Sequence, residues 1–303
     1  MDESSPSIEN SRRLWVTVSW VLVGTLVGQL ASVGVLLIAG YSLSDGIPDL
    51  AALPGHVLAG MVAVVQLLGY LIPGLISATT LFGKLWPRAV QLLPSPSLRQ
   101  LALGVVAFAL CMPMTAALAE LNLSIELSGW QLDIEDNVTQ TLTAIIQNGS
   151  IGGLLVAIVI VAVLPALGEE LVFRGLIQPG LIKATGSGHV GVWLTALAFG
   201  LVHLQFAGLL PRVFLGAVLG FLAYYSQRLW VPVLAHFLFN GAQVIALRMG
   251  ALDQAEELDK NLDIDSLWTT LLGIAGVVLA SFLLPRLRPG TEQPELPDEL
   301  SSE

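Results

Sequence analysis

Three charged side chains lie close together in the stretch GEELVFRG, at the end of a long apolar run. Glu170 and Arg174 are four residues apart, so they share one face of a helix and an ion pair between them is expected. Glu169 points about 100° away from Glu170 and is left without a local counter-ion. A carboxylate in a poorly hydrated place holds a proton more readily, which suits a general base. The motif alone fits a functional site and an ordinary helix end in the lipid head groups equally well.

Two histidines and an asparagine occur inside other apolar runs. His203 is in AFGLVHLQF, with Phe199 four residues earlier on the same helical face. His236 is in VPVLAHFLFNG and precedes Asn240 by four residues, so the two share a face about 6 Å apart along the axis. A hydrogen bond to a neighbouring helix would explain each of them structurally, as would a His–Asn pair between helices. Such groups are costly in hydrocarbon unless they are paired or face a wet cavity.

In combination these residues favour a hydrolytic site over separate structural roles. A glutamate and a histidine, Glu169 and His203, can position and deprotonate water. His236 and Asn240 can donate hydrogen bonds to the oxyanion that forms when water attacks an amide carbonyl, and a low-dielectric cleft strengthens such contacts. Depth is the difficulty, since His236 is expected about 9 Å into its span and His203 about 18 Å. A break near Gly200 or a longer preceding helix would bring the two level.

The composition indicates an all-α protein that crosses a membrane several times. Of its 303 residues 54% are hydrophobic and 12% are charged, whereas soluble globular chains carry about 25% charged residues. A spanning helix needs roughly 20 apolar residues, and about eight candidate segments are present: 14–39, 57–82, 101–119, 151–173, 190–209, 212–228, 230–248 and 267–285. No basic cluster is present, so nucleic acid is not an expected partner. The lipid bilayer of a bacterial plasma membrane is the expected location.

The Lys and Arg residues predict the orientation of these spans. Nine of them fall on one side of the membrane: Arg12, Arg13, Lys84, Arg88, Arg99, Lys183, Arg228, Arg286 and Arg288. Only three fall on the other side: Arg212, Arg248 and Lys260. The positive-inside rule then places both termini in the cytoplasm and Glu169, at the end of the fourth span, near the cytoplasmic face. The loop 120–150 has five acidic and no basic residues, so it is expected outside, with a short amphipathic helix over Val138 to Gly149.

The chain divides into five expected parts. These are a cytoplasmic tail (1–13), the first spans with the outer loop (14–148), a core that carries the candidate residues (149–249), an acidic loop with the last span (250–288), and a polar acidic tail (289–303). The last part is punctuated by prolines and is expected to be disordered.

The sequence resembles a known family at three stretches, in this order on successive predicted spans: EELVFR (Glu169 to Arg174), FGLVH (Phe199 to His203) and HFLFN (His236 to Asn240). They resemble the three motifs of the CPBP intramembrane proteases. This family, also called Abi, includes the type II CAAX prenyl endopeptidases. The resemblance covers roughly residues 150–245, and no motif position departs from it.

The resemblance implies peptide-bond hydrolysis in a membrane-embedded cavity open to the cytosol. Carried over by position, Glu169 looks like the base that activates water, with His203 as its partner. His236 and Asn240 look like the oxyanion hole. The remaining motif residues look like a supporting ion pair: Glu170 and Arg174. The implied substrate is a membrane-associated peptide or protein, and the sequence does not reveal whether it is prenylated.

Metal dependence is left open by these residues. The family is often labelled a metalloprotease, and Glu169, His203 and His236 form an adequate three-ligand zinc set with an open position for water. A metal-free account uses the same atoms as a base and as hydrogen-bond donors. Spacing does not separate the two accounts, and the metal-free one is favoured here.

Two other functions compete with a peptidase. A proton-linked transporter also uses intramembrane Glu, His and Arg residues, but it would predict internal repeats, and none is evident in the sequence. A non-catalytic scaffold or bacteriocin-immunity protein would keep the fold and act through its loops. The intact set of motifs argues against that loss of catalysis.

Overall fold

The fold is a bundle of membrane-spanning helices. The computed structural model describes residues 6–42, 44, 46, 48–147, 150–250 and 266–289, and within these ranges it contains helices and no strand. Among the described residues, seven helical segments are long and apolar enough to cross a membrane: Arg12–Ile38, Gly55–Ala89, Leu98–Leu123, Ile151–Thr185, Phe206–Ser226, Trp230–Arg248 and Leu267–Leu287. The apolar helix Gly188–Leu201 is shorter. The prediction of an all-α polytopic membrane protein is therefore confirmed, and its count of about eight spans is close.

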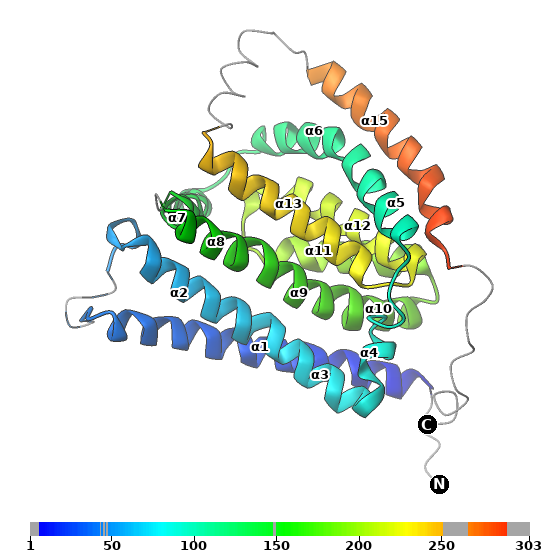
Figure 1. Cartoon of the computed structure of the whole chain (residues 1–303), viewed down its shortest axis with the longest axis horizontal. Coiled ribbons are helices and arrows are strands. Elements are labelled where there is room, and N and C mark those ends of the chain that lie inside the picture. The colour runs from blue at the N-terminus through cyan, green and yellow to red at the C-terminus, as the bar shows by residue number, and fades with distance from the viewer. Residues whose placement is uncertain are drawn as a thin grey trace.

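The first part of the chain supplies six helices: α1 (Pro6–Ile38), α2 (Gly55–Gln66), α3 (Ile72–Phe82), α4 (Trp86–Ala89), α5 (Leu98–Leu110) and α6 (Met112–Leu123). A π-helical segment, η2 (Leu67–Leu71), joins α2 to α3, and α1 packs along both of them (Figure 1). Because α1 begins at Pro6, most of the expected tail 1–13 is helical. The acidic stretch 253–265 and the tail from residue 290 lie outside the described residues.

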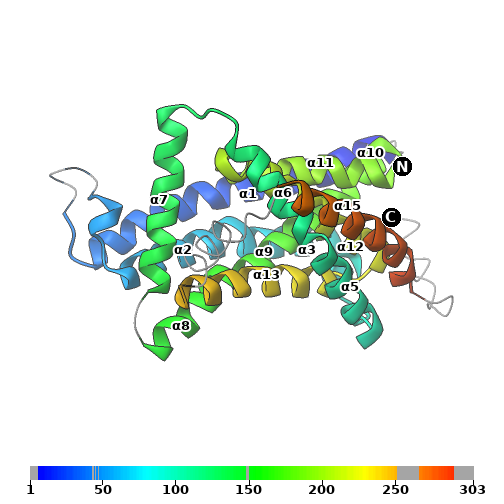
Figure 2. The ribbon, with the colours of Figure 1, turned by 90° about the horizontal axis from the view of Figure 1, so that it is seen from above.

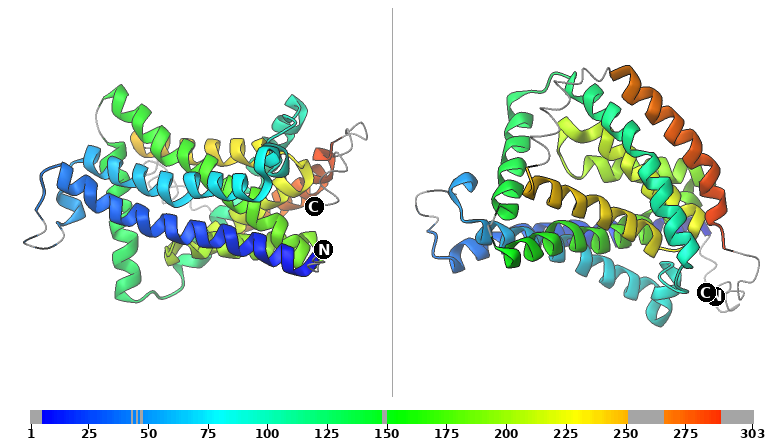
Figure 3. Two further views of the ribbon diagram at one scale, coloured as in Figure 1. Left: turned by 90° about the horizontal axis from the view of Figure 1, so that it is seen from below. Right: turned by 45° about the horizontal axis from the view of Figure 1, so that its top comes forward.

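The second part supplies the rest of the bundle: α7 (Gly129–Ile146), α8 (Ile151–Ile158), α9 (Leu164–Glu170), α10 (Gln178–Thr185), α11 (Gly188–Leu201), α12 (Leu209–Ser226), α13 (Trp230–Arg248) and α15 (Ser266–Leu283). The π-helical segments η4 (Val159–Val163) and η5 (Leu171–Ile177) make α8, α9 and α10 one continuous rod. At the far edge of the bundle α15 packs along α5 and α6 (Figure 3).

The fourth span corrects the expected position of the two glutamates. It was expected to end near residue 173, but the helix continues without a break from Ile151 to Thr185. Glu169 and Glu170 therefore lie near its middle and not at a helix end in the head groups. The apolar sequence is interrupted there while the helix is not, because Glu170 and Arg174 pair with each other on one helical face.

The fifth span is shorter than expected and ends just before His203. Helix α11 stops at Leu201, and a turn over residues 202–205 leads into a single 3-10 turn, η6 (Phe206–Gly208). Leu204 in this turn has φ +56°, a left-handed conformation that ends a helix abruptly. The chain thus breaks near Gly200, one of the two alternatives proposed for bringing His203 level with His236. The fourth span, which comes before α11, is also longer than expected.

The helix in the loop 120–150 is longer than predicted and lies across the bundle. It was expected over residues 138–149, but α7 begins at Gly129, because Ser128 and Gln131 form a capping box at its N-terminus. Residues 148 and 149, the expected helix stop, lie outside the described part of the chain. Seen from above, α7 runs roughly perpendicular to the spans, at the end of the bundle opposite to the start of α1 (Figure 2).

Glycines let α12 pack closely on α11 and leave its carbonyls open to side chains of the fourth span. Arg174 Nη2 donates to the carbonyl of Gly216 at 3.0 Å, and one turn later Gln178 Nε2 donates to the carbonyl of Gly220 at the same distance. A Cβ on Gly216 would come within 3.1 Å of Phe199. Two buried side chains therefore reach backbone carbonyls directly, and this places α12 beside the glutamates.

Candidate active site

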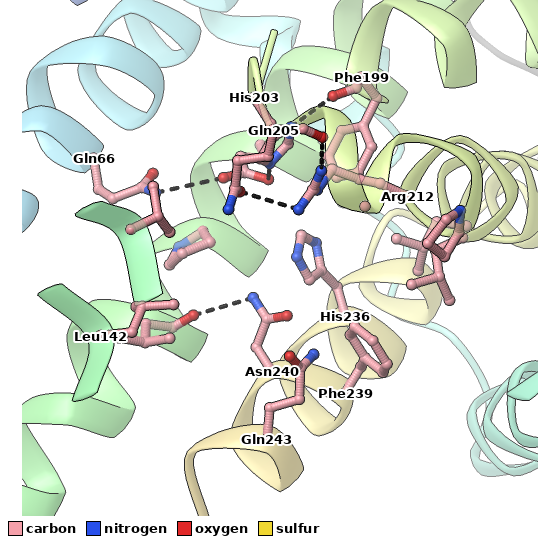
Figure 4. Close-up of a pocket in the computed structure, with 18 of the residues that line it drawn as sticks. Gln66, Leu142, Phe199, His203, Gln205, Arg212, His236, Phe239, Asn240 and Gln243 are labelled. Atoms are coloured by element: carbon pink, nitrogen blue, oxygen red, sulfur yellow. Dashed lines mark hydrogen bonds and ion pairs between the residues drawn. The ribbon is translucent and has the colours of Figure 1, made fainter. Parts of the chain in front are cut away.

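All four predicted catalytic residues line one cavity. The cavity has a volume of about 380 Å³ and lies inside the bundle, between α9, the turn after α11, and α13. Glu169, His203, His236 and Asn240 are among its lining residues. Figure 4 shows His236 and Asn240 on α13 facing His203 and Arg212 across the cavity. Side chains that are up to 71 residues apart in sequence, from Glu169 to Asn240, are thus brought together.

Glu169 has two polar neighbours in this cavity. Gln66, at the end of α2, donates from Nε2 to Glu169 Oε1 at 3.5 Å. His203 Nε2 lies 4.0 Å from Glu169 Oε2, and the glutamate side chain is 5% exposed. A separation of 4.0 Å is too long for a direct hydrogen bond, and it is a distance that a water molecule can bridge. The N-terminal helices, whose role the sequence left open, therefore contribute a contact to the site.

Glu170 is the centre of a buried ion-pair network. Its Oε1 lies 2.9 Å from Nη1 of Arg174, which confirms the pair predicted from their spacing. The same oxygen lies 2.8 Å from Nδ1 of His236, a contact between α9 and α13 that the spacing did not predict. The side chains of both Glu170 and Arg174 are fully buried. The expected supporting pair is thus joined directly to one of the expected oxyanion donors.

Hydrogen bonding fixes which ring nitrogen of each histidine faces the cavity. An ionised carboxylate and a backbone carbonyl are acceptors only, so the nitrogen bonded to either must carry the proton. His236 Nδ1 is bonded to Glu170, and His203 Nδ1 to the carbonyl of Phe199 at 2.7 Å. Both imidazoles therefore have Nε2 left for substrate or water.

Asn240 is held by a carbonyl that a proline has released. In a regular helix the carbonyl of Val161 would accept from the N–H of residue 165, but Pro165 has no N–H. That carbonyl lies in the π-helical segment η4 and accepts from Asn240 Nδ2 at 3.0 Å. The second N–H of the Asn240 amide is left for another acceptor. The pairing of His236 with Asn240, considered as a structural explanation, is replaced by these separate partners.

Several lining residues were not predicted. Phe199 packs its ring 4.5 Å from the guanidinium of Arg174 and 4.9 Å from the His203 ring, so it separates the ion pair from the cavity. Gln205 and Arg212 border the cavity from the turn and from α12. The sequence placed Arg212 at the start of the sixth expected span, and this position gave no signal that it borders the site.

The cavity reaches the acidic end of the bundle. Val138 and Leu142 of α7 line it together with Glu169, and α7 lies opposite to the start of α1 (Figure 2). Two predictions therefore conflict, namely a site near the cytoplasmic face and an extracytoplasmic loop 120–150. A cavity bordered by α7 faces the same side of the membrane as that loop.

The predicted zinc ligands do not form a metal site in this arrangement. Within the ranges that the structure describes, no three His, Cys, Asp or Glu side chains are grouped so that they could hold one ion. His236 has its Nδ1 engaged by Glu170, so Nε2 is its one remaining ligand atom. The mechanism proposed below uses only the side chains.

Comparison with known proteins shows what the core of this chain is similar to. Residues 151–242 match the model of the type II CAAX prenyl endopeptidase Rce1-like family. A similar protein is "Putative membrane peptidase YdiL" of Bacillus subtilis (strain 168), 29% identical over 122 residues, which are 40% of this chain and 48% of that protein. The chain thus spans about half the length of this relative. No solved structure matches the chain significantly. The match over residues 151–242, which carry all the motif positions, supports a relation of this segment to the CPBP family of CAAX-protease-type membrane proteins.

Proposed function

We propose that this protein is an intramembrane endopeptidase in which Glu169 activates a water molecule. The observation that carries the proposal is the pair formed by Glu169 and His203, 4.0 Å apart in a cavity inside the bundle. The family-model match over residues 151–242 and the similarity to a membrane peptidase support peptidase activity in general. The residue roles are inferred from the geometry.

Water activation follows from the two free atoms of this pair. A water between Glu169 Oε2 and His203 Nε2 donates one hydrogen bond to each, because both atoms are acceptors in this arrangement. Glu169 takes the proton as oxygen attacks the scissile carbonyl, and it then returns the proton to the leaving amine nitrogen. The hydrogen bond from His203 Nδ1 to Phe199 fixes the ring, so Nε2 stays aimed at the water.

We propose that His236 and Asn240, on the opposite wall of the cavity, stabilise the oxyanion. Asn240 can donate its second amide N–H, since the first is engaged by Val161. His236 donates from Nε2 in the form in which both ring nitrogens carry protons, with Nδ1–H held by Glu170. Two donors aimed at the developing charge in a site of low dielectric make the tetrahedral intermediate accessible.

The rest of the cavity indicates an apolar substrate segment. Four large apolar side chains form part of its wall: Phe108, Leu215, Leu219 and Phe239. Such a wall fits an extended, membrane-associated peptide with apolar side chains, and neither the wall nor the motifs select for a prenyl group. We also propose that the protein resides in a bacterial plasma membrane with both termini cytoplasmic, so that α7 and the cavity face the outer side.

Cleavage of a peptide library by the purified protein tests the proposal. Cleavage is expected with and without a chelator, because no step in the mechanism uses a metal. The Glu169→Ala protein, matched for folding, is the control and is expected to leave the library intact. Loss of cleavage on chelation would overturn the metal-free mechanism. Failure of the wild-type protein to cleave any peptide would overturn the function and favour a non-catalytic scaffold.

A further inference from the structure

The turn that carries His203 is fastened from outside the family-matched segment. Residues 202–208 connect α11 to α12 and contain Leu204 in a left-handed conformation. A turn of this kind does not hold a side chain rigidly through its own backbone hydrogen bonds. His203 must nevertheless keep its Nε2 near Glu169, so the contacts that immobilise the turn bear directly on the site.

Helix α6 supplies the first contact through Asn122, which is 1% exposed. Its Nδ2 donates to the carbonyl of Phe206 at 2.8 Å, and its Oδ1 accepts from the N–H of Leu210 at 2.8 Å. One amide side chain thus binds a carbonyl at the end of the turn and an N–H in the first turn of α12. Four N–H groups at a helix start have no intrahelical partner, so Asn122 both caps α12 and holds η6 against α6.

Helix α7 supplies the second contact through Glu135. Its Oε1 accepts from the N–H of Ala207 at 3.0 Å, and its Oε2 accepts from Nε2 of Gln205 at 3.3 Å. Gln205 is also held from the other side, because Arg212 Nη1 donates to its carbonyl at 2.9 Å and Nη2 to its Oε1 at 3.0 Å. Arg212 and Gln205 line the same cavity as Glu169, so this network reaches from α7 to the wall that carries the proposed base.

We propose that Glu135 and Asn122 are positioning residues that hold the 202–208 turn so that His203 stays opposite Glu169. Both lie outside residues 151–242, the segment matched by the family model. This inference rests on the proposed function, since the position of His203 matters for catalysis only if the pair activates water. It gives the perpendicular helix α7 a role in the site.

The experiment compares Glu135→Ala and Glu135→Gln with Asp136→Ala in purified protein. Asp136 is the neighbouring acid on α7 and is exposed, so Asp136→Ala removes the same charge without a contact to the turn. For Glu135→Ala we expect kcat to fall about 10-fold or more with KM changed less than about 2-fold, because a misplaced catalytic group slows the chemical step more than binding. Glu135→Gln keeps an oxygen for the Ala207 N–H and should recover part of kcat. Asp136→Ala should match the wild type.

Hydrogen–deuterium exchange over residues 205–210 gives a second readout that needs no activity. Exchange at Ala207 and Leu210 is expected to speed up in Glu135→Ala and in Asn122→Ala respectively, while the melting temperature of Glu135→Ala stays near that of the wild type. Unchanged exchange, or a kcat equal to the wild type, overturns the positioning role. A wild-type protein that cleaves nothing would overturn the proposed function and the catalytic role of the turn, while exchange would still show whether the two residues fasten it.

Discussion

Glu169 and Glu170 are adjacent in sequence but have different contacts, and this suggests different roles for them. Glu170 accepts from Arg174 and His236 and is fully buried, so its loss leaves charged and polar groups without partners. Glu169 has only looser contacts, to Gln66 and His203. Under the proposed function, Glu170 maintains the structure and Glu169 is the carboxylate available for chemistry.

Substitution of each glutamate by alanine should separate these roles. Glu170→Ala leaves the Arg174 guanidinium buried without its ion partner, which costs about 3–5 kcal/mol, and should lower the melting temperature and the folding yield. Glu169→Ala should unfold near the wild-type temperature but cleave at least about 10²-fold more slowly, because a general base contributes that much. Thermal unfolding in detergent and peptide cleavage are the measurements. An equal loss of stability in both variants would contradict the division.

The proline in the fourth span gives a second prediction at this scale. Pro165→Ala introduces an N–H that can bond to the Val161 carbonyl, in competition with Asn240. We expect kcat to fall several-fold while stability stays the same or rises slightly. Pro179→Ala, in the same rod but away from the cavity, is the matched control and should not change kcat. A Pro165→Ala protein with wild-type kcat would show that this carbonyl does not position the amide.

Local contacts of the site were predictable from sequence, and distant ones were not. The Glu170–Arg174 pair follows from a spacing of four residues on one helix. The contact between Glu170 and His236 joins residues 66 positions apart, and only the packing of α9 on α13 determines it. Gln66, Glu135 and Asn122 belong to stretches without a motif, so nothing in the sequence distinguished them from ordinary polar residues.

At the scale of elements, the site depends on long helices that contain π-helical segments and continue beyond them. The segments η2, η4 and η5 keep their rods continuous while they change which side chains share a face. The sequence predicted where apolar runs lie, but it placed the end of the fourth span at the charges and missed the continuation to Thr185. A hydropathy profile averages over a segment and does not detect ion pairing. The charged pair inside the bundle therefore looked like the end of the span.

The contact between α11 and α12 gives a prediction about packing. Gly216→Val places a side chain where even a Cβ comes within 3.1 Å of Phe199 and 3.3 Å of the Cα of Ala196. Overpacking of this kind costs about 1–3 kcal/mol, so the melting temperature should fall. The control is Gly34→Val on α1, where a Cβ meets nothing within 4 Å, and its melting temperature should change little. Equal melting temperatures for the two variants would show that α12 can move away from α11 at no cost.

At the scale of the whole molecule, basic and acidic residues lie at opposite ends of the bundle. The start of α1 and the end of α15 lie at the same end of the bundle, and α7 lies at the opposite end (Figures 1 and 2). Basic residues flank the spans at the first end, and five acidic residues occur in the loop with α7. The positive-inside rule predicts that the first end is cytoplasmic. The cavity, which α7 borders, then takes its substrate from the outer side.

Labelling of single cysteines in intact cells tests this orientation. The lone native cysteine, Cys111, is buried and is replaced by serine in the background. Asp133→Cys on α7 should then react with a membrane-impermeant maleimide, whereas Lys183→Cys at the end of α10 should react only after the cells are broken. The reverse pattern would place the termini outside and the cavity toward the cytoplasm.

The position of Glu170 and Arg174 on a single rod also has a consequence for how the chain enters the bilayer. Because the two are one turn apart, their charges can cancel as soon as that helix has formed, before α12 or α13 has been synthesised. The span can therefore partition into lipid as a nearly neutral unit, without waiting for a later helix to compensate an isolated charge. The carbonyl of Gly216 and the ring of His236 then become available in order of synthesis, so each new helix finds a partner already in place. Biogenesis of the site would thus follow the order of the chain.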